Sequence, residues 1–297
     1  MSECKLCPRE CKADRSKGQR GRCQVSGEGI LVARAALHLW EEPCISGEHG
    51  SGAVFFCGCP LRCVYCQNSQ ISGAERGKRI SKERLAEIFL ELAKKGAANV
   101  NLVTPTHYTP EIIWAVERAR QCGLKIPIVY NCSGYEKVET LETLKDTVDI
   151  YLTDFKYMEE EMASRYSSAP DYPQVAKKAL AEMVCQAGPP VFDSDGMMTR
   201  GVIVRHLLLP GHRKNAEAVV KYVHEKFKNQ VYLSLMNQYT PLSQVKRLYP
   251  ELGRKVGKRE YECLVDYAIS LGVECAYIQE GKTAKESFIP DFDCGGV

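Results

Sequence analysis

The stretch GCPLRCVYCQN, residues 58–68, contains three cysteines, Cys59, Cys63 and Cys66, in the spacing C-x3-C-x2-C. In a chain without a secretory signature, such closely spaced thiols favour metal ligation over disulfide pairing. A four-iron cluster has one corner iron per ligand, so three cysteines leave one iron free to bind an exogenous molecule, as an open catalytic site requires. The alternatives are a structural zinc site and an electron-transfer cluster. Both usually need a fourth nearby ligand, and the spare Cys57 ends an apolar run typical of a buried strand.

Length and composition set the broad class of the protein. The chain has 297 residues, 15 cysteines and a formal net charge of +3. This length suits one large α/β domain or two ordinary ones, and the nearly balanced charge argues against a dedicated nucleic-acid-binding protein. The sequence has no apolar run long enough to span a membrane and no signal-peptide pattern at its start. We therefore expect a cytoplasmic protein whose cysteines are thiols and metal ligands.

A second group of cysteines lies in residues 1–34, which contain few large apolar side chains. Cys4, Cys7, Cys11 and Cys23 are spaced C-x2-C-x3-C-x11-C. Such a segment cannot build a hydrophobic core, and we expect it to fold on a metal, either zinc or a second iron–sulfur cluster. Eight basic and four acidic side chains give the segment a charge of +4, which lowers the electrostatic cost of a tetrathiolate site. The alternative is four unconnected thiols in a disordered segment.

From residue 53 onward, short apolar runs alternate with longer stretches of helical periodicity. The predicted strands are residues 53–57, 100–103, 126–130, 149–153, 201–209 and 231–235. Ser81 caps the first helix and Pro110 begins the second. Six strands, each followed by a helix, predict parallel strands with right-handed crossovers, hence an α/β fold. Periodicity alone fits either a barrel or an open doubly wound sheet.

Three further features lie near or after the end of this repeat. The Asp195-Gly196 pair predicts a hairpin before the fifth strand. The tail from residue 260 is expected to add a helix through Leu264, Tyr267, Ala268 and Leu271, followed by a short strand at residues 276–278. Helical sequence over residues 159–187 should break near its two prolines.

Polar residues follow the predicted strands at the edge where α/β folds place their chemistry. Asn131 and Ser133 follow the third strand, and Asp154 and Lys156 end the fourth. A carboxylate and an ammonium two residues apart point the same way from an extended strand, so they can reach ribose hydroxyls or a charged ligand group. The alternative is a salt bridge at a strand end. Arg205 lies inside the apolar fifth strand, where an arginine needs an anionic partner, so we expect it to contact a carboxylate or a ribose.

The cysteine spacing, with the aromatic Tyr65 just before the last cysteine, resembles the signature of the radical S-adenosylmethionine (radical SAM) superfamily. This resemblance implies a partial (β/α)6 TIM-type barrel with a 4Fe-4S cluster on the loop after its first strand. It also implies an oxidoreductase or lyase-type enzyme that reductively cleaves S-adenosylmethionine (SAM) to a 5′-deoxyadenosyl radical, which abstracts hydrogen from a substrate. The reaction needs an electron donor, of flavodoxin or ferredoxin type.

Further residues resemble the pyruvate formate-lyase activating enzyme group, in particular its PflX-type branch. They are CKLCPREC at residues 4–11 with Cys23, LHLWEEP at residues 37–43, and Gln67-Asn68. Related proteins with assigned functions make a glycyl radical in a partner protein, so the implied substrate is a protein, a peptide or a small molecule. Where the superfamily commonly has a Gly-Gly-Glu-type turn, this chain has Thr104-Pro105-Thr106. The residues that the resemblance assigns to SAM binding are Tyr65, Thr104, Asn131, Ser133, Asp154, Lys156, Arg205 and Gln238.

We therefore expect four regions: a Cys-rich metal-binding segment (1–34), a connecting segment (35–52), a partial barrel (53–240) and a C-terminal extension (241–297). Within the connecting segment we expect His38 to be a packing residue. One alternative function is an enzyme that cleaves SAM at another bond or transfers methyl groups. Another is a non-catalytic iron–sulfur or zinc protein for electron transfer or partner binding.

Overall fold

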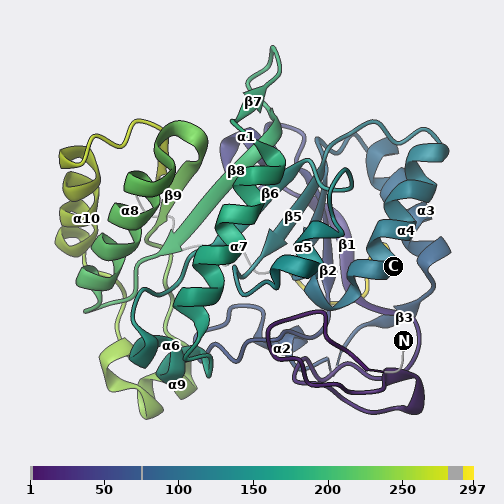
Figure 1. Cartoon of the computed structure of the whole chain (residues 1–297), viewed down its shortest axis with the longest axis horizontal. Coiled ribbons are helices and arrows are strands. Elements are labelled where there is room, and N and C mark those ends of the chain that lie inside the picture. Colours follow the sequence, from purple (N-terminus) through teal and green to yellow (C-terminus); the bar gives the residue numbers. More distant parts are fainter. Residues whose placement is uncertain (1–2, 75, 280–289) are drawn as a thin grey trace.

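The structure, a computed structural model, describes residues 3–74, 76–279 and 290–297, and its centre is a single twisted sheet. The strand order is β10-β9-β8-β6-β5-β4-β2-β1-β3 (Figure 1). From β10 to β2 all neighbouring strands are parallel. In the described part of the chain β10 and β3 form the two edges, so the sheet is an open, partial barrel. The parallel strands are β2 (Ser51–Phe56), β4 (Val100–Val103), β5 (Ile128–Cys132), β6 (Ile150–Asp154), β8 (Met198–Leu207), β9 (Tyr232–Met236) and β10 (Ala276–Ile278).

Helices connect the parallel strands and cover the outer face of the sheet, so the predicted strand–helix alternation is confirmed (Figure 1). Ser81 caps the first of these helices, accepting a hydrogen bond from the Arg84 backbone N–H at 3.2 Å. The helical sequence over residues 159–187 breaks where predicted. The connecting helices are α3 (Lys82–Lys94), α4 (Thr109–Gln121), α5 (Val138–Glu142), α6 (Glu160–Ser167), α7 (Tyr172–Ala187), α8 (Arg213–Phe227), α9 (Ser243–Leu248) and α10 (Lys258–Ser270).

Two antiparallel strands at one edge of the sheet were not predicted. β1 (Ile30–His38) pairs with β2 on one side and with β3 (Lys78–Ile80) on the other. β1 is rich in alanine, and β3 is short and mostly charged, so neither has the β-branched alternation that indicates a strand. β1 crosses residues 34 and 35, so the N-terminal cysteine segment continues directly into the sheet.

The hairpin predicted before the fifth parallel strand is present. β7 (Val191–Phe192) pairs antiparallel with the first residues of β8 and projects from the end of the sheet opposite to the N-terminal segment (Figure 1). Short helices α1 (Pro43–Ser46) and α2 (Ser69–Ser72) flank β2. No helix in the described ranges is long and apolar enough to cross a bilayer.

The N-terminal segment is mostly irregular and packs beside α2, against the loop that follows β2 (Figure 1). Gly58 in that loop has φ of +91°, and a Cβ built there would lie 2.7 Å from the Cys23 carbonyl oxygen. Only glycine tolerates this combination of left-handed backbone and close approach. The first cysteine segment and the loop of Cys59 are therefore in direct contact.

Candidate active site

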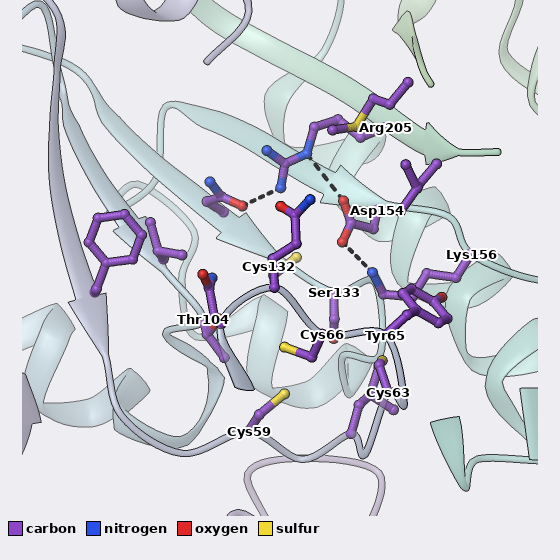
Figure 2. Close-up of a pocket in the computed structure, with 18 of the residues that line it drawn as sticks. Cys59, Cys63, Tyr65, Cys66, Thr104, Cys132, Ser133, Asp154, Lys156 and Arg205 are labelled. Atoms are coloured by element: carbon purple, nitrogen blue, oxygen red, sulfur yellow. Dashed lines mark hydrogen bonds and ion pairs between the residues drawn. The ribbon is translucent and has the colours of Figure 1, made fainter. Parts of the chain in front are cut away.

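A cavity of about 240 Å³ opens where the parallel strands end, and residues far apart in the sequence line it (Figure 2). The loop after β2 supplies three cysteines to its wall, and the ends of β4, β5, β6, β8 and β9 supply the polar groups. Every residue that the sequence assigned to the cluster or to SAM lies in this wall. These residues are Cys59, Cys63, Tyr65, Cys66, Thr104, Asn131, Ser133, Asp154, Lys156, Arg205 and Gln238.

The three cysteines present partly buried thiols to the cavity, as Figure 2 shows for Cys59 and Cys66, whose sulfur atoms point toward the same space. Burial raises the pKa of the Cys66 thiol to about 12, and the nearby Cys63 adds to the shift. Burial also raises the pKa of Cys59, with further contributions from Cys63 and Cys66. Partly buried thiolates this close together need a cation to stabilise them, and metal coordination deprotonates a thiol outright. The donor set therefore fits a cluster bound at three corners.

A fourth cysteine, Cys132, also lines the cavity but interacts with different groups. Its Sγ donates to Thr153 Oγ1 on the neighbouring strand at 3.4 Å. Burial raises its pKa, followed by the charge of Glu136. The Cys132 thiol is thus engaged with β6 and the buried Glu136.

A network of charged side chains crosses the barrel interior above the cysteines (Figure 2). Arg205 is at its centre: Nε lies 3.1 Å from Asp154 Oδ1, Nη1 lies 3.0 Å from Glu41 Oε2, and Nη2 donates to Asn131 Oδ1 at 2.6 Å. Lys156 Nζ lies 2.5 Å from Asp154 Oδ2. Although burial acts to raise it, the charges of Lys156 and Arg205 hold the pKa of Asp154 below its usual value. The network presents fixed charges of both signs to the cavity.

Glu41 is a member of this network that the sequence did not predict. Its Oε1 accepts hydrogen bonds from Asn101 Nδ2 at 3.0 Å and Asn131 Nδ2 at 3.2 Å. Glu41 follows the end of β1. Because β1 runs antiparallel to β2, residues 39–42 reach the barrel interior. The neighbouring Glu42 is buried, which raises its pKa, and its Oε2 has no hydrogen-bond partner among the described residues. Two adjacent glutamates in an otherwise apolar stretch are the sequence signal that could have indicated these positions.

Tyr65 and Thr104 support the site in different ways. The Tyr65 hydroxyl lies 2.6 Å from that of Tyr157, which in turn lies 2.8 Å from Ser167 Oγ. Ser167 Oγ donates to Cys63 Sγ at 2.9 Å, so this chain of hydroxyls ends on a cluster cysteine. Thr104 has φ of 60°, an unusual value for a β-branched residue, and this bend turns the loop after β4 toward the cavity.

Gln238 and His38 both contact neighbouring side chains. Gln238 Oε1 accepts a hydrogen bond from Gln279 Nε2 at 3.2 Å at the end of β9. His38 packs edge-on against Phe55, with ring centroids 6.0 Å apart, as expected of a packing residue, and it also lines the cavity.

Two of the N-terminal cysteines contact a partly buried arginine. Arg15 Nη2 donates to Cys4 Sγ at 3.3 Å and to Cys23 Sγ at 3.7 Å. Burial raises the pKa of Cys7 to about 12, whereas Cys11 is exposed. Throughout the described residues, no group of three His, Cys, Asp or Glu side chains is arranged to ligate a single metal ion. Cysteines that hold a polynuclear cluster bind separate irons and need not converge in that way.

An α/β partial barrel with three cysteines and a ring of polar strand ends at one cavity defines a class of cluster-dependent enzymes. Residues 53–230 match the Radical SAM superfamily, and the chain belongs to this superfamily. In its members a 4Fe-4S cluster and SAM carry out radical chemistry that begins with SAM cleavage.

Three known proteins are similar to this chain. The uncharacterized protein MJ0674 of Methanocaldococcus jannaschii is 28% identical over 284 residues, which are 93% of this chain and 77% of that protein. Streptococcus suis SuiB, solved with its precursor peptide SuiA, gives a TM-score of 0.50 at 15% identity over 75% of this chain and 46% of the other. HydG, a maturase of the [FeFe]-hydrogenase, gives a TM-score of 0.51 at 15% identity, over 77% of this chain and 51% of HydG. The chain thus spans about half the length of these two solved proteins. Both support the partial-barrel fold.

Proposed function

We propose that this chain binds a 4Fe-4S cluster through Cys59, Cys63 and Cys66 and uses it to cleave SAM reductively. When bound, the cluster supplies the electron that splits SAM into methionine and a 5′-deoxyadenosyl radical, which removes hydrogen from a substrate. The observation that supports this assignment best is that three partly buried thiols and a charged network line one cavity.

The charged network is suited to hold the two ends of SAM. Lys156 and Arg205 offer cations to the carboxylate of the methionine moiety, while Asp154 offers an acceptor for its ammonium group or for the ribose hydroxyls. Asn131 and Ser133 contribute neutral donors and acceptors at the end of β5, and Tyr65, Thr104 and Gln238 complete the pocket. Arg205 is fixed by three contacts before any ligand arrives, so little reorganisation is needed on binding.

Product analysis after anaerobic incubation with SAM and dithionite tests this function. We expect 5′-deoxyadenosine from the wild-type protein and from Cys185→Ala, which alters an exposed cysteine on α7. Cys63→Ala should form none. If the wild-type protein releases 5′-methylthioadenosine or S-adenosylhomocysteine instead, the chain cleaves SAM at another bond or transfers methyl groups. No nucleoside product at all would favour the non-catalytic iron–sulfur or zinc protein.

We further propose a protein or peptide substrate, with glycyl-radical formation as the reaction, in keeping with the resemblance to the PflX-type branch. Leu39 and Trp40 are 53% and 58% exposed, and Trp40 lines the cavity, so an apolar surface borders the entrance. Deuterium transfer tests the proposal. Proteins grown on deuterated glycine should enrich 5′-deoxyadenosine in deuterium, whereas enrichment only with a small-molecule fraction would exclude a protein substrate.

We propose that Cys4, Cys7, Cys11 and Cys23 hold a second metal site, either zinc or an iron–sulfur cluster. The contacts of Cys4 and Cys23 with one arginine, and the position of Cys23 against the cluster loop, support a shared role. Metal analysis of an anaerobically purified Cys59/Cys63/Cys66 triple-alanine variant separates the possibilities. Retained zinc or retained iron identifies the metal, and the absence of both would refute the site.

A radical SAM enzyme needs an electron donor. For this chain we propose a donor of flavodoxin or ferredoxin type in the cytoplasm.

A further inference from the structure

Three arginines gather on the surface directly over the loop that carries the cluster cysteines. Arg9 Nε donates to the Pro60 carbonyl at 3.1 Å, and Arg62 Nη2 donates to the Arg22 carbonyl at 3.0 Å. Arg62 immediately precedes Cys63 in the sequence. These two bonds fasten the N-terminal segment to the cluster loop and bring the three guanidinium groups together. We call Arg9, Arg22 and Arg62 the arginine surface.

The charges of the arginine surface repel one another. The three guanidinium groups are close enough that the charges of Arg9 and Arg62 both act on Arg22. Arg22 is exposed, and the other two are half-buried.

Within the described ranges, none of the three forms an ion pair with a carboxylate. The carboxylates nearby have other partners. The Asp171 carboxylate, close to the Tyr135 ring that Arg9 covers, accepts hydrogen bonds from the Tyr135 hydroxyl. Three of the four acidic residues of the N-terminal segment pair with lysines: Glu3 with Lys5, Glu10 with Lys137 and Asp14 with Lys17. The arginine surface is therefore a partly exposed cationic site without a carboxylate partner among the described residues.

We propose that the arginine surface docks an acidic redox protein that delivers electrons to the cluster. This inference rests on the proposed function. The surface covers the cluster loop, so a protein bound there places its carrier next to the backbone that leads to Cys63. Complementary charge steers such partners and sets their orientation. The donor's reduced flavin loses one electron, the cluster gains it, and no bond is made or broken between the proteins.

An acidic redox protein fits this surface better than a nucleic acid does. The chain as a whole carries only +3, whereas nucleic-acid binding normally uses an extended basic stripe. The cationic site is compact and lies at the cluster loop, where an electron donor must approach.

The test compares the double variant Arg22→Glu/Arg62→Glu with wild type and with Arg259→Glu, a charge reversal of an exposed arginine on the distant α10. Binding of an acidic flavodoxin is measured by its flavin fluorescence, and cluster reduction is followed with flavodoxin hydroquinone. We expect the dissociation constant to rise about tenfold or more in the double variant and to stay unchanged in Arg259→Glu. Photoreduced deazaflavin, a small uncharged donor, should reduce all three proteins equally.

Equal flavodoxin affinity in wild type and double variant at low salt would overturn the inference. So would a loss of RNA retention in the double variant with flavodoxin binding unchanged, because the surface would then serve a nucleic acid. If the double variant loses iron, the salt dependence of flavodoxin binding to the wild-type protein tests the inference instead. Its flavodoxin affinity should fall steeply from about 0.05 to about 0.5 M salt, and no fall would refute charge-driven docking. Flavodoxin binding requires no SAM cleavage, so a missing 5′-deoxyadenosine product refutes the proposed function without affecting this test.

Discussion

Replacing Glu41 by glutamine removes one of the two carboxylates that neutralise Arg205 inside the barrel. Arg205 Nη1 lies 3.0 Å from Glu41 Oε2, and the Arg205 and Glu41 side chains are 14% and 9% exposed. At an effective dielectric constant of about 20, the attraction at this distance is about 5.5 kcal/mol before desolvation is subtracted. Breaking a buried pair from one side typically costs about 3–5 kcal/mol. Asp154 still faces Arg205 in the variant, so we expect the free energy of unfolding to fall by about 3 kcal/mol, at the low end of that range.

A surface pair provides the matched control. Glu91 on α3 lies 2.5 Å from Arg84, with side chains 43% and 33% exposed. Glu91→Gln should cost less than about 1 kcal/mol, because water already screens that pair. Urea denaturation of both variants measures the difference. Equal losses in Glu41→Gln and Glu91→Gln would refute the account of a buried, mutually dependent network.

Three further predictions concern a cluster ligand, a buried histidine and a loop glycine. Cys63→Ala should abolish the change in the cluster spectrum on adding SAM, whereas Cys185→Ala should keep it. Burial lowers the pKa of His206 to about 4, below the value of about 6.5 in the unfolded chain. The neutral, buried His206 therefore makes its full contribution to the free energy of unfolding above about pH 6.5, and this contribution is lost as the pH falls. Unfolding free energies should drop by about 2 kcal/mol more between pH 6.5 and 5 in wild type than in His206→Gln, and parallel curves would contradict this. Gly58→Ala should reduce the iron content of the purified protein because its Cβ meets backbone at 2.7 Å, whereas Gly18→Ala, with φ of +76° and nothing within 4 Å, should not. Equal iron in these two variants would exclude a steric role for the contact.

The polar ring around the cavity was predictable from sequence because parallel strands end at one edge. Once the apolar runs are assigned to parallel strands, the residues at their carboxyl ends are expected to lie at one edge of the sheet. Asn131, Asp154 and Arg205 line the same cavity there. The cysteine loop was equally predictable from the sequence, because its three cysteines lie close together along the chain.

The other half of the charged network could not be predicted from local patterns. Glu41 reaches Arg205 only because β1 runs antiparallel to β2, and an alanine-rich strand gives no strong strand signal. The contact between Cys23 and Gly58 joins parts of the chain with no common sequence pattern, so the position of the N-terminal segment over the cluster loop appeared only in the structure.

The most direct test of the whole account asks whether SAM binds the iron that no protein side chain holds. Electron–nuclear double resonance of the reduced, reconstituted protein with SAM labelled by ¹⁷O in its carboxylate and ¹⁵N in its amino group measures this contact. We predict hyperfine coupling from both labels to the cluster of Cys59, Cys63 and Cys66. Absence of both couplings, with Cys132 or another side chain bound to the remaining iron, would contradict the account.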